Sequence, residues 1–172
     1  KDRTIVLNGV SKVYAMTGWR IGYAAGPQNI ITAMETIQSQ STSNPTSISQ
    51  VAAEAGLKGD QSYILPMLKA FRERHDAVCK RLNEIEGLSC RPADGAFYLF
   101  PDARSAIEKL VAAGKIAEKT DIAFCNYLLE IGEVAVVPGS AFGAEGYFRL
   151  SYATSMENLM KAMDRIEKAL VC

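Results

Sequence analysis

Residues 11–23 read SKVYAMTGWRIGY, and no other stretch of the chain carries as much chemical information. Before this stretch, residues 5–7 form a short apolar run that ends at Asn8-Gly9, a pattern typical of a buried strand that leads into a turn. At its end, residues 21–25 form a second strand-like run. Lys12 is therefore expected just after one strand and Arg20 just before the next.

The residue types in this stretch suit an aldehyde cofactor that carries a phosphate. A lysine beside a strand end, among apolar and small residues, is expected to be partly desolvated and to act as a nucleophile toward a carbonyl group. Arg20 offers a planar donor fork suited to a phosphate dianion, and Gly18 and Gly22 allow the backbone to approach a ligand closely. In the competing interpretation, Lys12 and Arg20 are ordinary solvated loop residues, and spacing alone does not exclude it.

The whole run resembles the pyridoxal-phosphate attachment site of class I and II aminotransferases, where Ser-Lys is followed by Thr-Gly-Trp-Arg and Gly-Tyr. The similarity extends to the final helix and is closest to the bacterial branch that contains aspartate and prephenate aminotransferases. It implies that Lys12 binds the cofactor covalently and shuttles the substrate proton, and that Arg20 binds the cofactor phosphate with Ser11 as a nearby hydroxyl. Many relatives have a serine three residues before the lysine, where this chain has Gly9.

A second arginine lies in an apolar strand near the end of the chain. In FRLSY, residues 148–152, strand alternation places Arg149 and Ser151 on one face. An arginine there is expected to meet an anion, either a protein carboxylate or a substrate carboxylate. The similarity of RLSYA to the family motif implies that Arg149 binds the α-carboxylate of the amino acid.

Two further residues are assigned to the substrate site through the resemblance. GAFY, residues 95–98, is similar to the strand that brings an aromatic residue to the rim of the family's substrate pocket, which implies that role for Phe97; core packing explains Phe97 equally well. Asn44 occupies the position where relatives extend a loop toward the partner subunit, although Ser-Asn-Pro is also ordinary turn chemistry. His75, the only histidine, is expected to be solvated and non-catalytic, and no cluster has metal-ligand spacing.

The order of strands and helices predicts an α/β chain of fold type I. We expect the end of the large pyridoxal-phosphate domain in residues 1–60 and a small α+β carboxyl-terminal domain in residues 61–172. Apolar periodicity predicts helices over residues 27–41, 48–57, 62–85, 104–113, 121–132 and 156–170, and strands over 95–100, 134–137 and 148–152. The helix over 62–85 is expected to pack Leu65 and Leu68 against the sheet with the rest of its apolar face.

The longest apolar runs are far too short to cross a bilayer, so we expect a cytoplasmic globular protein. Nineteen Lys and Arg balance nineteen Asp and Glu, so neither nucleic acid nor a membrane is an expected partner. The four cysteines lie far apart and are expected to be reduced and structural. The chain opens on Lys1 in a strand-like segment, and the family's glycine-rich phosphate loop, its Asp and its Tyr would lie upstream, so we expect a portion of a longer protein.

The expected activity is transfer of an amino group between an amino acid, with aspartate or glutamate as donor, and a 2-oxo acid, by a homodimer. Two alternatives stay open. A pyridoxal-phosphate lyase acting on sulfur amino acids would use the same lysine and arginines. A non-catalytic ligand-sensing or interaction module could be built on the same domain.

Overall fold

The computed structural model describes residues 2–171, which divide into two compact units. Unit 1 ends at Leu65 and unit 2 begins at Pro66. The boundary falls in the first turn of one long helix, α3, which comprises Ile64–Glu84.

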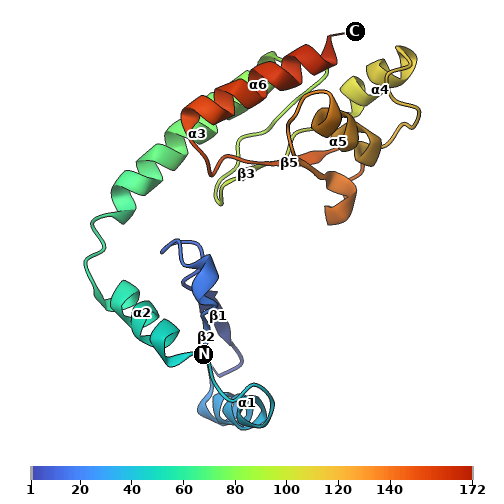
Figure 1. Cartoon of the computed structure of the whole chain (residues 1–172). Helices are drawn as coiled ribbons and strands as arrows, with labels where there is room; N and C mark the ends of the chain where they lie inside the picture. Colours follow the sequence, from blue (N-terminus) through green and yellow to red (C-terminus); the bar gives the residue numbers. More distant parts are fainter. Residues whose placement is uncertain (1, 172) are drawn as a thin grey trace. The chain divides into compact units, whose positions relative to one another are not determined.

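Unit 1 is built around an antiparallel β-hairpin of β1 (Val6–Gly9) and β2 (Gly22–Ala25), seen in blue in Figure 1. The pairing runs from Val6 opposite Ala25 to Gly9 opposite Gly22. The strand therefore continues through Asn8-Gly9, where a turn was expected. Glycine suits this position, because a Cβ on Gly9 would lie 3.2 Å from the carbonyl oxygen of Ile21.

Two helices complete unit 1, α1 (Gln28–Ser41) and α2 (Ser47–Lys58). Helix α1 begins directly after Pro27, whose fixed φ suits the entry to a helix. The fully buried apolar side chains of unit 1 form one small cluster of Val10, Ile21 and Ala53. Many large apolar side chains stay exposed instead, among them Leu7 at 74%, Ile37 at 71% and Ile48 at 71%.

Unit 2 has a three-stranded antiparallel sheet in the order β3-β5-β4. Its strands are β3 (Tyr98–Leu99), β4 (Val137–Pro138) and β5 (Phe148–Ser151). Its helices besides α3 are α4 (Arg104–Ala112), α5 (Asp121–Glu130) and α6 (Met156–Leu170). Figure 1 shows α6 in red alongside α3 in green. Arg81 joins these two helices through Asp164 and Glu167.

The main core of unit 2 lies between the helices and one face of the sheet. Helix α6 buries Leu159, Met163, Ile166 and Ala169, a helical spacing that explains why its limits match the predicted ones. Ser155 caps its start by accepting a hydrogen bond from the Asn158 N–H. From the sheet, Leu99, Phe148 and Leu150 enter the same cluster.

Three predicted features differ from the structure. Leu65 and Leu68 are 71% and 58% exposed, so the apolar face of α3 is buried only further along, from about Phe71 to Leu82. The strand predicted over residues 95–100 is shorter, because Ala96 adopts a left-handed φ of 63°. The strand predicted over 134–137 pairs only from Val137 onward.

Three cysteines of unit 2 have buried thiols. Cys79, Cys90 and Cys125 are free, and Cys172 lies outside the described residues. Burial raises the pKa of Cys90 and of Cys125 to about 12. These thiols are therefore protonated at neutral pH. None of the helices within residues 2–171 is long and apolar enough to span a membrane.

Candidate functional site

Lys12 and Arg20 lie on the loop that joins the paired ends of β1 and β2. Beyond the last strand pair, the Val10 N–H still donates to the Ile21 carbonyl oxygen at 3.4 Å, so residues 11–20 form the end of the hairpin. Antiparallel pairing thus brings two cationic side chains, separated by eight positions in sequence, to the same end of one hairpin.

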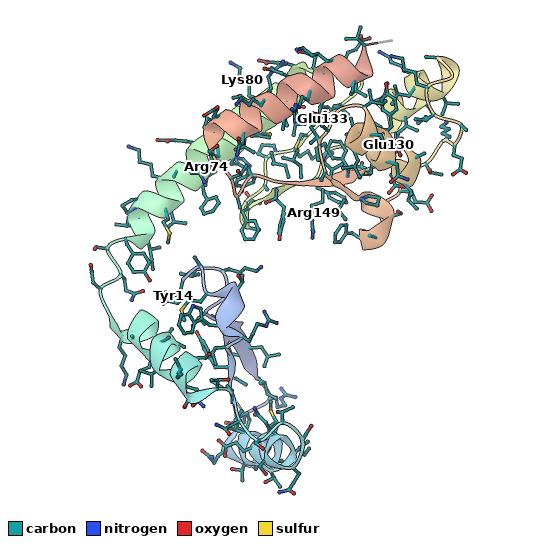
Figure 2. The ribbon with its side chains drawn as sticks, in the orientation of Figure 1. Tyr14, Arg74, Lys80, Glu130, Glu133 and Arg149 are labelled. Carbon is teal, nitrogen blue, oxygen red and sulfur yellow. The ribbon has the colours of Figure 1, made fainter. Side chains whose placement is uncertain are left out.

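The hairpin loop is held by short-range turns and by a hydrogen bond to the segment between α2 and α3. The Tyr14 N–H donates to the Val10 carbonyl oxygen at 3.3 Å, and the Ala15 N–H donates to the Lys12 carbonyl oxygen at 3.2 Å. Tyr14, labelled in Figure 2, donates through its hydroxyl to Gln61 Oε1 at 3.2 Å. This tyrosine anchor joins positions 47 residues apart, and sequence analysis missed it because spacing gives no sign of it.

Lys12 is exposed, which corrects the expectation that it is partly desolvated in this chain. The reason is the small core of unit 1, in which Val10, Ile21 and Ala53 are the buried apolar residues. Ser11 is half-buried beside it.

Arg20 adopts a left-handed backbone conformation with φ 56° and ψ 47°. It ends the short 3-10 helix η1 (Thr17–Trp19), and its guanidinium Nη1 donates to the Thr17 carbonyl oxygen at 3.0 Å. A positive φ is uncommon for a residue with a side chain, and such residues concentrate at functional sites. No carboxylate in the described part of the chain forms an ion pair with Arg20, so most of its donors are available for another anion.

Arg149 lies on the central strand of the unit 2 sheet, on the face away from α3 and α6 (Figure 2). The burial pattern of β5 confirms the predicted alternation, with Phe148 and Leu150 buried and Arg149 half-buried. Its guanidinium carbon lies 4.4 Å from the ring centre of Tyr98 and 4.6 Å from that of Phe142. Where sequence analysis expected an anion, the structure has two aromatic rings.

The loop that carries Phe142 is fixed by a buried carboxylate. Phe142 is the last residue of the short helix η2 (Gly139–Phe142), and Asp121 Oδ2 accepts a hydrogen bond from the Ser140 N–H at 2.7 Å. Burial raises the pKa of the Asp121 carboxyl, but hydrogen bonds from Ser140 and from backbone N–H groups outweigh it, and the pKa lies below its usual value. Asp121 is only 3% exposed. Its position at a predicted helix start did not reveal that it is buried and holds this loop.

Phe97 and Asn44 have local contacts of the kinds that core packing and turn chemistry predict. Phe97 is half-buried, packs against the core, and stacks on Phe71 with ring centres 6.2 Å apart. Asn44 is exposed in the turn before α2, where its Nδ2 donates to the Pro45 carbonyl oxygen at 3.0 Å.

His75 is buried at 4% exposure, so the expectation of a solvated histidine is wrong. The Ala93 N–H donates to His75 Nε2 at 2.9 Å. Since Nε2 accepts, the neutral ring carries its hydrogen on Nδ1 and donates it to Asp76 Oδ1, 2.7 Å away. The run of charged neighbours in sequence favoured a solvated histidine and concealed this role, although one of these neighbours, Asp76, is itself a partner of the buried ring.

Comparison with known proteins identifies the family. The family Aminotransferase class I and II matches residues 1–166. The chain belongs to the class I and II aminotransferases. It is 63% identical over 170 residues to an aspartate/prephenate aminotransferase of Nitrosomonas europaea, covering 99% of this chain and 43% of that relative. It is 53% identical to an aspartate aminotransferase of Rhizobium meliloti, covering 98% of this chain and 41% of that relative.

Solved structures of other aminotransferases have the same fold. The aspartate aminotransferase of Rhizobium meliloti matches with a TM-score of 0.92 and 51% identity, over 99% of this chain and 42% of that chain. An aromatic aminotransferase of Pyrococcus horikoshii matches with a TM-score of 0.86 and 42% identity, over 98% of this chain and 43% of that chain. The chain thus has the α/β fold of this family and spans less than half the length of these relatives.

Proposed function

We propose that the protein containing residues 1–172 is a pyridoxal-phosphate-dependent aminotransferase that acts in the cytoplasm as a homodimer. The observation that carries this proposal is the hairpin that places Lys12 and Arg20 at one end of β1 and β2. The buried free thiols of unit 2 are in keeping with a reducing compartment.

The chemistry of the hairpin side chains fits the two ends of the cofactor. Lys12 supplies a primary amine for the aldehyde, and Arg20 supplies a guanidinium for the phosphate, with the Ser11 hydroxyl nearby in sequence. One Arg20 donor is used by Thr17, and the lack of a paired carboxylate among residues 2–171 keeps the others for phosphate oxygens. A Cβ built on Gly18 would meet no atom within 4 Å, so this side of the backbone is open to a ligand.

Each proposed residue has a defined task. When bound, pyridoxal phosphate supplies an electron-withdrawing ring that stabilises negative charge at the substrate Cα. Lys12 Nζ is the base that takes the Cα proton of the amino acid. Arg149 holds the α-carboxylate by two parallel hydrogen bonds. Phe97 contributes to the rim of the substrate pocket, and Asn44 belongs to the loop that extends toward the partner subunit.

We further propose aspartate or glutamate as the amino donor and a 2-oxo acid as the acceptor. The support is the similarity to relatives named aspartate/prephenate and aspartate aminotransferase. A lyase that shares Lys12, Arg20 and Arg149 would release free ammonia, whereas a transferase conserves the amino group in a new amino acid. Product analysis of the protein with aspartate and a 2-oxo acid separates the two.

The proposal is tested by absorbance spectroscopy of the protein with added pyridoxal phosphate. We expect wild type to show the visible band of lysine-bound cofactor and to lose it when aspartate is added. Lys12→Ala lacks the band, while Lys69→Ala, which removes another exposed lysine, retains it. Reduction with borohydride followed by peptide mass mapping then locates the cofactor on Lys12.

Two outcomes would contradict the proposal. Identical featureless spectra from wild type and Lys12→Ala would favour the non-catalytic sensing module. A band that persists in Lys12→Ala, with the cofactor mapped to another lysine, would exclude Lys12 as the attachment site. Light scattering after size-exclusion chromatography checks the homodimer separately, since a monomer at micromolar concentration would overturn that part.

A further inference from the structure

We propose that Tyr98 and Phe142 are positioning residues for Arg149, holding its guanidinium between two aromatic rings so that its N–H donors stay available for a planar carboxylate. The positioning rests on geometry alone, while the identity of the anion as a substrate carboxylate rests on the proposed function.

The two rings reach Arg149 from opposite neighbours of its strand. Strand β5 is central in the order β3-β5-β4; Tyr98 belongs to β3, and Phe142 follows β4 on η2. Tyr98 is paired with Ser151, which lies on the same face of β5 as Arg149. Val137 of β4 is paired directly with Arg149 on the other side. The order of the strands therefore places one ring on each side of the guanidinium.

Aromatic rings and carboxylates hold a guanidinium in different ways. A ring attracts the cation through its negative face and needs no directed N–H donor. A carboxylate in a bidentate pair takes two of the donors that a ligand would need. Both ring centres lie within 4.6 Å of the Arg149 Cζ, and none of the carboxylates described in residues 2–171 forms an ion pair with it. The cation is thus held in place while its donors stay unused by protein anions.

The supporting ring on η2 is itself fixed. The ring of Phe142 meets that of Phe100 edge to face at 6.0 Å, on the same surface of the sheet. Asp121 holds the backbone of η2 through the Ser140 N–H. Gly139 leaves no space for a side chain, because a Cβ there would clash with the carbonyl oxygens of Ala144 and Tyr147. A ring mounted on so constrained a loop is suited to orienting a neighbour.

The two rings contribute by restricting the Arg149 side chain before a ligand binds. An arginine side chain loses considerable rotamer freedom when it binds a ligand in one geometry. A guanidinium already held between two rings has lost that freedom before the ligand arrives. Removal of one ring is therefore expected to weaken carboxylate binding while the charge of Arg149 is retained.

The first test measures how far the visible cofactor band is lost when a substrate is added to the cofactor-loaded protein, and this loss is the response. The two substrates are aspartate and isoasparagine, its analogue with an α-amide in place of the α-carboxylate. For Phe142→Leu, we expect the concentration of aspartate at half-maximal response to rise roughly tenfold, the scale of one partly desolvated cation–π contact. The response to isoasparagine should stay within about twofold of wild type on the same reasoning. Phe142→Tyr restores the ring and should restore the wild-type value.

The matched control is Tyr147→Leu, which removes the ring of the residue directly before β5. Tyr147 stacks on Phe100, with ring centres 5.5 Å apart, and contacts Arg104 rather than Arg149. We expect aspartate binding by this variant to equal that of wild type. Phe142 is 50% exposed, so its substitution should leave the fold intact.

A second measurement reads the positioning without any substrate. NMR relaxation of the Arg149 Nε–Hε group, assigned with Arg149→Lys, should give a lower order parameter in Phe142→Leu than in wild type. Equal order parameters in the two proteins would overturn the inference, as would Phe142→Leu binding aspartate as tightly as wild type while Arg149→Lys binds it weakly. A wild-type protein that ignores aspartate would instead overturn the proposed function and, with it, the substrate carboxylate as the anion.

Discussion

Arg20 combines a left-handed backbone with a guanidinium that no described carboxylate neutralises, so its charge is expected to serve a ligand. We predict that Arg20→Ala weakens pyridoxal-phosphate binding roughly 10- to 100-fold, because hydrogen bonds to a charged group contribute about 1.5–3 kcal/mol. Titration of the cofactor absorbance band measures this change. Arg91→Ala removes another exposed arginine and serves as the control; an equal loss in both variants would point to a nonspecific charge effect.

His75 illustrates a buried polar group whose role is structural. His75→Ala leaves the Ala93 N–H without its acceptor and removes a ring that packs edge to face on Tyr152, with centres 5.7 Å apart. We expect the free energy of unfolding to fall by roughly 2–4 kcal/mol, measured by urea denaturation. His75→Gln retains an acceptor and should recover part of this loss; a His75→Ala protein as stable as wild type would refute the assignment.

Sequence analysis could single out as candidates only those residues that a local pattern marks. Lys12, Arg20 and Arg149 stood out by type and by neighbouring sequence. The rings beside Arg149 come from positions 51 and 7 residues earlier in the chain, and no spacing rule connects them. For this reason the sequence indicated an anion partner, while the partners within the chain are aromatic.

At the scale of elements, η2 depends on the charge of Asp121 at the start of α5. The folded-state pKa of Asp121 lies below its ordinary value, so its contribution to stability is complete above about pH 4, the pKa of an unfolded Asp. This contribution disappears as the pH falls further through the folded-state pKa. Urea unfolding between pH 2 and 7 should therefore show a smaller acid-induced loss for Asp121→Asn than for wild type. Identical pH profiles would contradict this role.

The first and last residues of helices were predicted more accurately than those of strands, and α6 and β4 show the physical reasons. Helix α6 has both a buried apolar stripe and an N-cap serine, two local signals that agree. Strand β4 consists of Val137–Pro138 alone, because pairing with β5 rather than local hydrophobicity sets its limits. The exposed Leu65 and Leu68 of α3 show that an apolar stripe predicts which side can be buried, but not how far along the helix a partner surface extends.

At the scale of the molecule, the two units differ greatly in their cores. The buried cluster of unit 2 draws on every one of its helices and on its sheet, whereas that of unit 1 has three members. We predict that residues 62–172, which retain all of α3, unfold cooperatively in urea. A peptide of residues 1–65 should lack protected amides at Val6–Gly9, because so little burial cannot offset the conformational entropy of ordering the chain. Slow amide exchange in β1 of that peptide would contradict this expectation.

Trp19 is the only tryptophan in the 172 residues, and it precedes Arg20 directly on the hairpin loop. Its indole is 44% exposed, so its fluorescence should respond to whatever approaches that end of the hairpin. Because these 172 residues contain a single tryptophan, selective excitation of tryptophan reports on this loop and on no other element of the segment. Trp19 is therefore an intrinsic fluorescent probe of the hairpin loop that carries Lys12 and Arg20, and it requires neither a label nor an added tryptophan.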